Sequence, residues 1–161
     1  MLRAVTLGLL AALWFTLLSP PSPVAAEPTA CGDFLAEMGA KPEHLEFLEC
    51  RPDHEAQLRT LNARYRVAGT HAAEVEEYFV RTAGMARLRR NCCGWENRPE
   101  KPGDAHDGSL PHKRPLAPDG PTEPDLSIGM GSGETLEGRT REQWGEIPWF
   151  YVHVVMYLES P

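Results

Sequence analysis

The chain has no excess of positive charge and no apolar run long enough to cross a membrane. Its 161 residues include 16 Lys or Arg against 23 Asp or Glu, which gives a net charge of −7. An acidic protein is a poor candidate for binding nucleic acid or anionic membrane surfaces. The longest apolar run, residues 4–18, has 15 residues, whereas a membrane-spanning helix needs about 20. We therefore expect no nucleic-acid partner and no stable membrane insertion.

The sequence also lacks the short motifs that mark common enzyme classes. It contains no G-x-S-x-G, no H-E-x-x-H, no Walker-type motif and no dinucleotide-binding fingerprint. Internal repeats are absent as well. We therefore expect no catalytic residues, no cofactor and no metal site, and the sequence favours a non-catalytic protein.

Residues 1–26 have the pattern of a secretory signal peptide. Arg3 supplies the positive start, residues 4–18 are almost wholly apolar, and Val24-Ala25-Ala26 offers small residues for cleavage. Its removal leaves 135 residues, the size of one domain, and changes the net charge from −7 to −8. We expect an exported protein, periplasmic or extracellular. A retained membrane anchor and a lipoprotein acylated at Cys31 are the alternatives.

Four cysteines, Cys31, Cys50, Cys92 and Cys93, remain after that cleavage. An even number in an oxidising compartment indicates two disulfides. Adjacent Cα atoms lie about 3.8 Å apart across a trans peptide, whereas disulfides prefer roughly 4.4–6.8 Å. This disfavours a Cys92–Cys93 bridge and leaves two schemes, in which Cys31 and Cys50 each pair with one of the adjacent cysteines. A redox role for the adjacent pair is the alternative, although dithiol enzymes normally place two residues between their cysteines.

The clearest strand pattern covers residues 148–158. One face carries only apolar side chains, at Phe150, Val152, Val154, Met156 and Leu158. The other face carries Trp149, Tyr151, His153, Val155 and Tyr157, which are mostly aromatic. A strand that is apolar on both faces belongs in the middle of a sheet, with material above and below it.

The rest of the chain predicts an α+β fold. Apolar periodicity indicates strands at 45–50, 61–67, 85–95 and 126–130, and helices at 31–38, 71–83 and 140–144. Residues 96–124 are rich in proline and poor in apolar residues, which predicts a long flexible loop. We expect residues 27–161 to form a single domain, with a small, mainly antiparallel sheet, two or three short helices and stabilising disulfides.

Several short motifs resemble one known family. They are C-x-D-F-L at Cys31–Leu35, Lys41-Pro42, L-x-F at Leu45–Phe47, Cys50, Y-x-V-x-G at Tyr65–Gly69, C-C-x-W at Cys92–Trp95 and W-G-E-I at Trp144–Ile147. Together they resemble a family of small exported bacterial proteins, domain of unknown function 4952, over nearly the whole chain after the signal peptide except the proline-rich stretch. The resemblance supports export and the four-cysteine framework, and it implies no particular activity.

Three groups of residues are candidates for a site. Arg64, Arg66, Arg87, Arg89 and Arg90 would form a basic patch for an acidic partner if their strands were neighbours. Trp149, Tyr151, His153 and Tyr157 would form a ligand face, with His153 as a general base or as a packed histidine. Asp104, His106, Asp107 and His112 have metal-ligand chemistry, but a polar, solvated loop is the favoured interpretation.

Two functional hypotheses follow, beside a purely structural role without a dedicated partner. The first is an interaction module of the cell envelope, for example an inhibitor or immunity-type protein, that docks an unidentified protein partner through the arginines. It predicts no concave polar pocket. The second is a small-ligand binder or enzyme that uses the Tyr151/His153/Tyr157 face. It predicts His153 in an open cleft with a carboxylate within hydrogen-bond reach, and it would be excluded if His153 were sealed beneath the 71–83 helix.

Overall fold

The computed structural model describes residues 30–55, 57–111 and 125–158. The predicted signal peptide and His112 lie outside these residues. The elements, in chain order, are α1 (Phe34–Glu37), β1 (Glu46–Glu55), β2 (Leu58–Ala68), η1 (Gly69–His71), α2 (Ala72–Ala83), β3 (Leu88–Asn91), β4 (Gly94–Asn97), β5 (Gly108–Pro111), β6 (Asp125–Gly131), η2 (Arg141–Glu146) and β7 (Trp149–Tyr157). Among the described residues, no helix has the length and apolar character that crossing a membrane requires.

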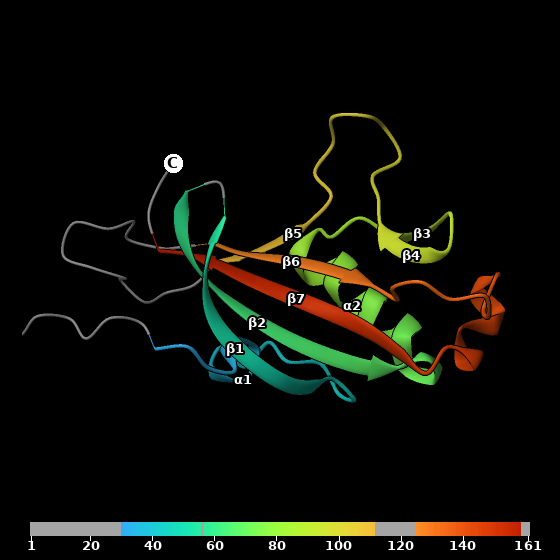
Figure 1. The fold of residues 1–161 in the computed structure, drawn as a ribbon, viewed down its shortest axis with the longest axis horizontal. Coiled ribbons are helices and arrows are strands. Elements are labelled where there is room, and N and C mark those ends of the chain that lie inside the picture. The colour runs from blue at the N-terminus through green and yellow to red at the C-terminus, as the bar shows by residue number, and fades with distance from the viewer. Residues whose placement is uncertain (1–29, 56, 112–124, 159–161) are drawn as a thin grey trace, which may run out of the picture.

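β7 lies at the centre of a seven-stranded sheet (Figure 1). The strand order is β1-β2-β7-β6-β4-β3, and β5 also pairs with β6. Every pairing among the described strands is antiparallel. The α+β fold with a mainly antiparallel sheet and short helices is therefore confirmed.

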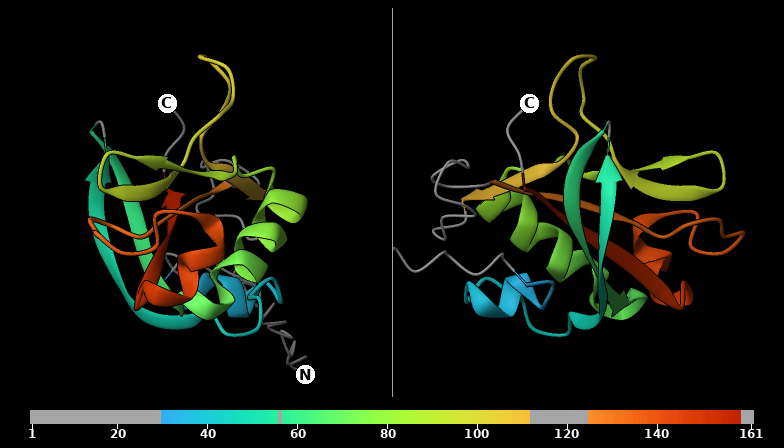
Figure 2. Two further views of the ribbon diagram at one scale, coloured as in Figure 1. Left: turned by 90° about the vertical axis from the view of Figure 1, so that its right-hand side faces the viewer. Right: turned by 60° about the vertical axis from the view of Figure 1, so that its left-hand side comes forward.

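One face of the sheet, which we call the buried face, carries the core. In the pairing register Tyr65 of β2 and Met130 of β6 both lie opposite Val152 of β7. This face comprises Leu61, Ala63, Tyr65, Val67, Leu110, Leu126, Ile128, Met130, Phe150, Val152, Val154 and Met156, all of them buried. Val75 and Phe79 of α2 belong to the same core, and the views in Figures 1 and 2 show α2 lying along this side of the sheet.

We call the opposite face of the sheet the open face. It carries the alternate side chains of β7 and the side chains beside them on the neighbouring strands. Here the structure corrects the expectation of material above and below the strand, because Trp149 and His153 are solvent-exposed and Tyr151 and Tyr157 are only partly buried. Tyr, Trp and His combine an apolar body with a polar tip, so such a face tolerates water. Neighbouring arginines also cover part of it, as described below.

Two strand boundaries differ from the sequence-based expectation. β1 continues through Pro52 to Glu55, beyond the strand expected at 45–50. β1 is an edge strand, where a proline lacking its N–H does not break a ladder. β5 lies within the proline-rich stretch; its Leu110 is buried opposite Leu126 of β6. The helix expected at 140–144 corresponds to η2, and Thr140 and Gln143 form a capping box at its start.

The disulfide connectivity is a second correction. The structure joins Cys31 to Cys50 and Cys92 to Cys93, the adjacent bridge that spacing disfavours. The expectation placed the adjacent pair on a strand, where successive side chains point to opposite faces. Instead the pair forms the turn between β3 and β4, where Asn91 pairs with Gly94 and Cys92 has a φ of 50°. A turn does not send successive side chains to opposite faces, so the two sulfurs meet.

A buried carboxylate links α2 to the end of the sheet. The Glu76 side chain is fully buried, and its Oε1 accepts hydrogen bonds from the Leu88 amide at 2.6 Å and from Arg141 Nη1 at 3.1 Å. Arg141 Nη2 also pairs with Glu76 Oε2. The Arg141 guanidinium lies 4.3 Å from the centre of the Trp144 ring. This pair therefore holds α2, β3 and η2 together.

Candidate functional site

Two of the predicted surfaces coincide on the open face. In the β2–β7 register, Arg64 lies opposite His153 and Arg66 lies opposite Tyr151. Directly opposed residues of an antiparallel pair point to the same face of the sheet. The predicted ligand face and the first two predicted partner-binding arginines are therefore parts of one surface.

A polar cleft of about 530 Å³ lies on this surface. Its residues include Arg64, Tyr151 and His153 on one side, Asn97, His106 and Asp107 on the other, and Gly129 and Gly131 of β6 between them. Because these two β6 residues lie directly beside His153 and Tyr151 in the register and have no side chains, they leave room above the sheet. A Cβ atom at Gly129 would come within 3.1 Å of Asp107 Oδ1.

A hydrogen-bond network fixes the carboxylate of Asp107. Its Oδ1 accepts from Asn97 Nδ2 at 2.9 Å, and its Oδ2 accepts from Ser127 Oγ at 2.9 Å. Asn97 is itself held, because its Oδ1 accepts from the Met130 amide at 3.1 Å. Each carboxylate oxygen has a further lone pair free for a ligand. The network therefore presents a positioned acceptor to the cleft.

His153 has a pKa below its usual value. Loss of solvent at the sheet surface is the main cause, and the positive charge of Arg64 adds to it, while Asp107 acts in the opposite direction. At neutral pH the imidazole is therefore uncharged, with one nitrogen that donates and one that accepts a hydrogen bond. His153 thus lies in an open cleft on the side of the sheet away from α2, and Asp107 lines the same cleft. Among the described residues no carboxylate is hydrogen-bonded to His153, so that part of the expectation is not met.

The two arginines of the open face are engaged with glutamates of β1. Arg64 Nη1 lies 3.0 Å from Glu49 Oε1. Arg66 donates two hydrogen bonds to Glu46, from Nε to Oε2 at 2.7 Å and from Nη2 to Oε1 at 3.1 Å. Its guanidinium also lies 4.2 Å from the centre of the Trp149 ring. The hydrogen bond from Arg66 lowers the pKa of Glu46. Their charge is therefore largely balanced within this face.

The other three predicted arginines lie elsewhere. Arg87 and Arg89 contact Glu77 and Glu100, each at 2.7 Å, and Arg90 donates to the carbonyl oxygens of Thr135 and Gly138 at 3.2 and 3.4 Å. β7, β6 and β4 separate β2 from β3 in the sheet. The structure therefore does not bring the five arginines together, and their role in binding a partner stays a prediction.

The sequence did not predict that residues on the far side of the cleft would face His153. Asp107 and His106 drew attention as possible metal ligands, whereas the structure engages Asp107 with Asn97 and Ser127. Asn97, Gly129 and Gly131 carried no local signal. Their positions depend on β4 and β5 pairing with β6, which periodicity alone does not reveal.

Comparisons with known proteins bear on the N-terminal part of the chain. Residues 22–95 match the sequence model of a family described as a domain of unknown function (DUF4952). The match contains the four cysteines and ends before the W-G-E-I motif, so it is shorter than the motifs indicated. No curated protein and no solved structure matches the chain. The resemblance to DUF4952, a family of unknown function, is thus confirmed over residues 22–95.

Proposed function

We propose that the protein is an exported, disulfide-stabilised, non-catalytic binding protein that takes a small polar ligand in the cleft of the open face. The observation that carries the proposal is the cleft itself, because a module that docks only through arginines requires no concave polar pocket. Tyr151, His153 and the fixed Asp107 carboxylate converge there.

The chemistry of the cleft favours a neutral, hydroxyl-rich ligand, such as a saccharide. The charged groups at its edge already have partners, since Arg64 pairs with Glu49, Glu96 pairs with Arg98, and Asp107 accepts two hydrogen bonds. What remains is a neutral imidazole, free lone pairs on Asp107 and the ring of Tyr151. Hydroxyl groups can donate to the carboxylate and exchange hydrogen bonds with the imidazole, and an aromatic ring offers an apolar surface to a sugar face.

Ligand-observed NMR with a panel of mono- and oligosaccharides tests the proposal on the secreted protein. Binding of at least one saccharide is expected, with at least tenfold weaker affinity for His153→Ala and Tyr151→Ala. His54→Ala is the matched control, because His54 lies exposed on β1, outside the cleft. A panel without binders, or equal binding by all variants, would contradict the proposal.

A second candidate is the interaction module of the cell envelope, of inhibitor or immunity type. The row of Arg–Glu pairs on β1 and β2 favours it, because such charges can be exchanged for those of a protein partner. Capture of a partner from an envelope extract should then weaken in Arg64→Ala and Arg66→Ala but not in Arg89→Ala. Equal capture by all three variants would count against this candidate.

Export is part of the proposal, supported by the signal-like residues 1–26 and by the disulfides, which persist in oxidising compartments. Mass spectrometry of the protein secreted from an expressing cell should give a chain beginning at Glu27. A product that retains residues 1–26 would contradict cleavage.

A further inference from the structure

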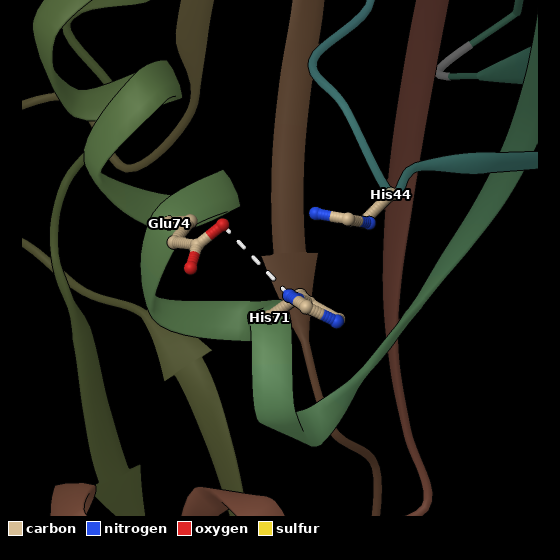
Figure 3. A group of neighbouring side chains, drawn as sticks. All are labelled: His44, His71 and Glu74. Carbon is tan, nitrogen blue, oxygen red and sulfur yellow. Dashed lines mark ion pairs between the residues drawn. The ribbon is translucent and has the colours of Figure 1, made fainter.

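Two histidines and a glutamate meet at the start of α2, away from the cleft (Figure 3). His44 precedes β1, His71 ends η1 and caps α2, and Glu74 lies in the first turn of α2. The imidazole rings of His44 and His71 are stacked, with centroids 3.7 Å apart and planes 18° from parallel. His71 Nδ1 lies 3.8 Å from Glu74 Oε2.

His71 presents an unsatisfied polar atom inside this cluster. Its Nδ1 is buried and has no hydrogen-bond partner among the described residues, and 3.8 Å to Glu74 is too long for a hydrogen bond. Buried polar atoms almost always have a partner, and an exception calls for an explanation such as an ion. A metal ion between the three side chains would provide that partner.

The geometry points to a divalent transition-metal site, most suited to Zn²⁺, formed by His44, His71 and Glu74. Ligand atoms of the three residues all lie within 4.8 Å of one another. Metal–ligand bonds of about 2.0–2.2 Å in a tetrahedral site place the ligand atoms about 3.3 Å apart. Small rotations of the exposed His44 and Glu74 side chains would bring the ligand atoms to this shorter separation. The same rotations would separate the stacked imidazole rings. Two imidazoles and one carboxylate leave the fourth position to water.

The charges around the cluster are mixed. A groove of about 670 Å³ between residues 39–43 and α2 adjoins Glu74, and its charged lining comprises Lys41, Glu43, Glu74, Glu77 and Arg81. The N-terminal end of α2 carries a partial positive charge that opposes a cation, and Glu74 offsets it. Imidazole is a suitable ligand for Zn²⁺, and two imidazoles together with Glu74 place one negative charge beside the ion.

A bound ion would tie the segment before β1 to the start of α2. His44 and His71 reach each other only through the fold, since the β1–β2 hairpin lies between them in the sequence. This explains why the sequence predicted no metal site. An ion that binds the folded state alone raises the free energy of unfolding, and this stabilisation grows with the logarithm of the ion concentration once that concentration exceeds the dissociation constant.

Zn²⁺ titration by calorimetry of the oxidised protein, after removal of metal with a chelator, tests the inference. One ion per chain and a rise in Tm with added Zn²⁺ are expected. His44→Ala and Glu74→Gln should each weaken binding at least tenfold and remove the rise in Tm. Both residues are exposed, so the variants should fold, which circular dichroism without metal checks.

His54→Ala and His153→Ala are the matched controls, because both histidines are exposed and lie outside the cluster. They should bind Zn²⁺ as the unmodified protein does. The inference is overturned if the unmodified protein takes up no Zn²⁺ at micromolar concentrations. It is equally overturned if the two controls lose as much affinity as His44→Ala.

Discussion

The two faces of β7 come from one alternating sequence, yet they have opposite environments. Phe150, Val152, Val154 and Met156 are completely buried, whereas Trp149 is 37% exposed and His153 lies in an open cleft. On the buried face apolar atoms contact apolar atoms, and a removed side chain leaves a cavity. On the open face aromatic rings lie beside arginines and water. Stability therefore depends mainly on the buried face, which leaves the open face available for binding.

The largest expected contrast is between neighbouring residues of β7. Phe150→Ala should lower the free energy of unfolding by about 3–5 kcal/mol, because it opens a cavity in the core. Trp149→Ala should cost about 1 kcal/mol or less, since its ring is partly exposed and stacks on Arg66. Urea unfolding of the two oxidised variants measures both values. Similar losses would show that the second face is also covered.

The two disulfides should differ in how much they stabilise the protein. Cys31 and Cys50 are 19 positions apart, and a bridge closing a loop of that length contributes about 3 kcal/mol in the chain-entropy model. Cys92 and Cys93 are neighbours, so their bridge closes no comparable loop. Replacing Cys31 and Cys50 together by alanine should therefore destabilise the protein much more than replacing Cys92 and Cys93 together. Equal midpoints in urea for the two double variants would refute this.

Ion pairs provide a third contrast between the interior and the open face. Glu76→Gln removes a fully buried charge from Arg141 and should cost about 3 kcal/mol. Glu46→Gln breaks an exposed pair with Arg66, and such pairs contribute little in water. Thermal unfolding in low and high salt should show a large, salt-insensitive loss for the first variant only. The reverse order would contradict the assignment of Glu76 to the interior.

The sequence predicted the sheet more successfully than the site. Alternation in residues 148–158 correctly predicted the burial of Phe150, Val152, Val154 and Met156, whereas Leu158 lies after β7 and is only partly buried. The helix expected at 140–144 corresponds to η2. The sequence could not show that the second face is open, because Tyr, Trp and His occur in both environments. Nor could it show the burial of Glu76, whose partner Arg141 lies 65 positions away. The cleft depends on the same kind of distant contact.

The smallest expected effects concern the pH dependence of stability. The pKa of Tyr65 on the buried face is raised, whereas that of His153 on the open face is lowered. Burial raises the pKa of Tyr65 on the buried face, so its folded state keeps a proton that the unfolded chain loses near pH 10. Stability should therefore fall as the pH rises above about 10, and Tyr65→Phe should reduce that fall. Urea midpoints measured from pH 7 to 11 test this, and identical profiles for the two proteins would refute it.

On the open face, burial and Arg64 lower the pKa of His153 below 6.5. The unfolded chain then takes up a proton that the folded state resists, so stability is full above about pH 6.5 and falls as the pH decreases. NMR titration of the imidazole should give a pKa below 6.5, and Arg64→Gln should raise it. An unchanged pKa in the variant would exclude the influence of Arg64.

Hydroxyl-radical footprinting of the oxidised protein tests most directly whether β7 separates a buried face from an open one. Rapid modification of Trp149, Tyr151 and His153 and strong protection of Phe150 and Met156 are expected, with the rates alternating along one strand. Equal protection of both sets, or rapid oxidation of Met156, would contradict this separation.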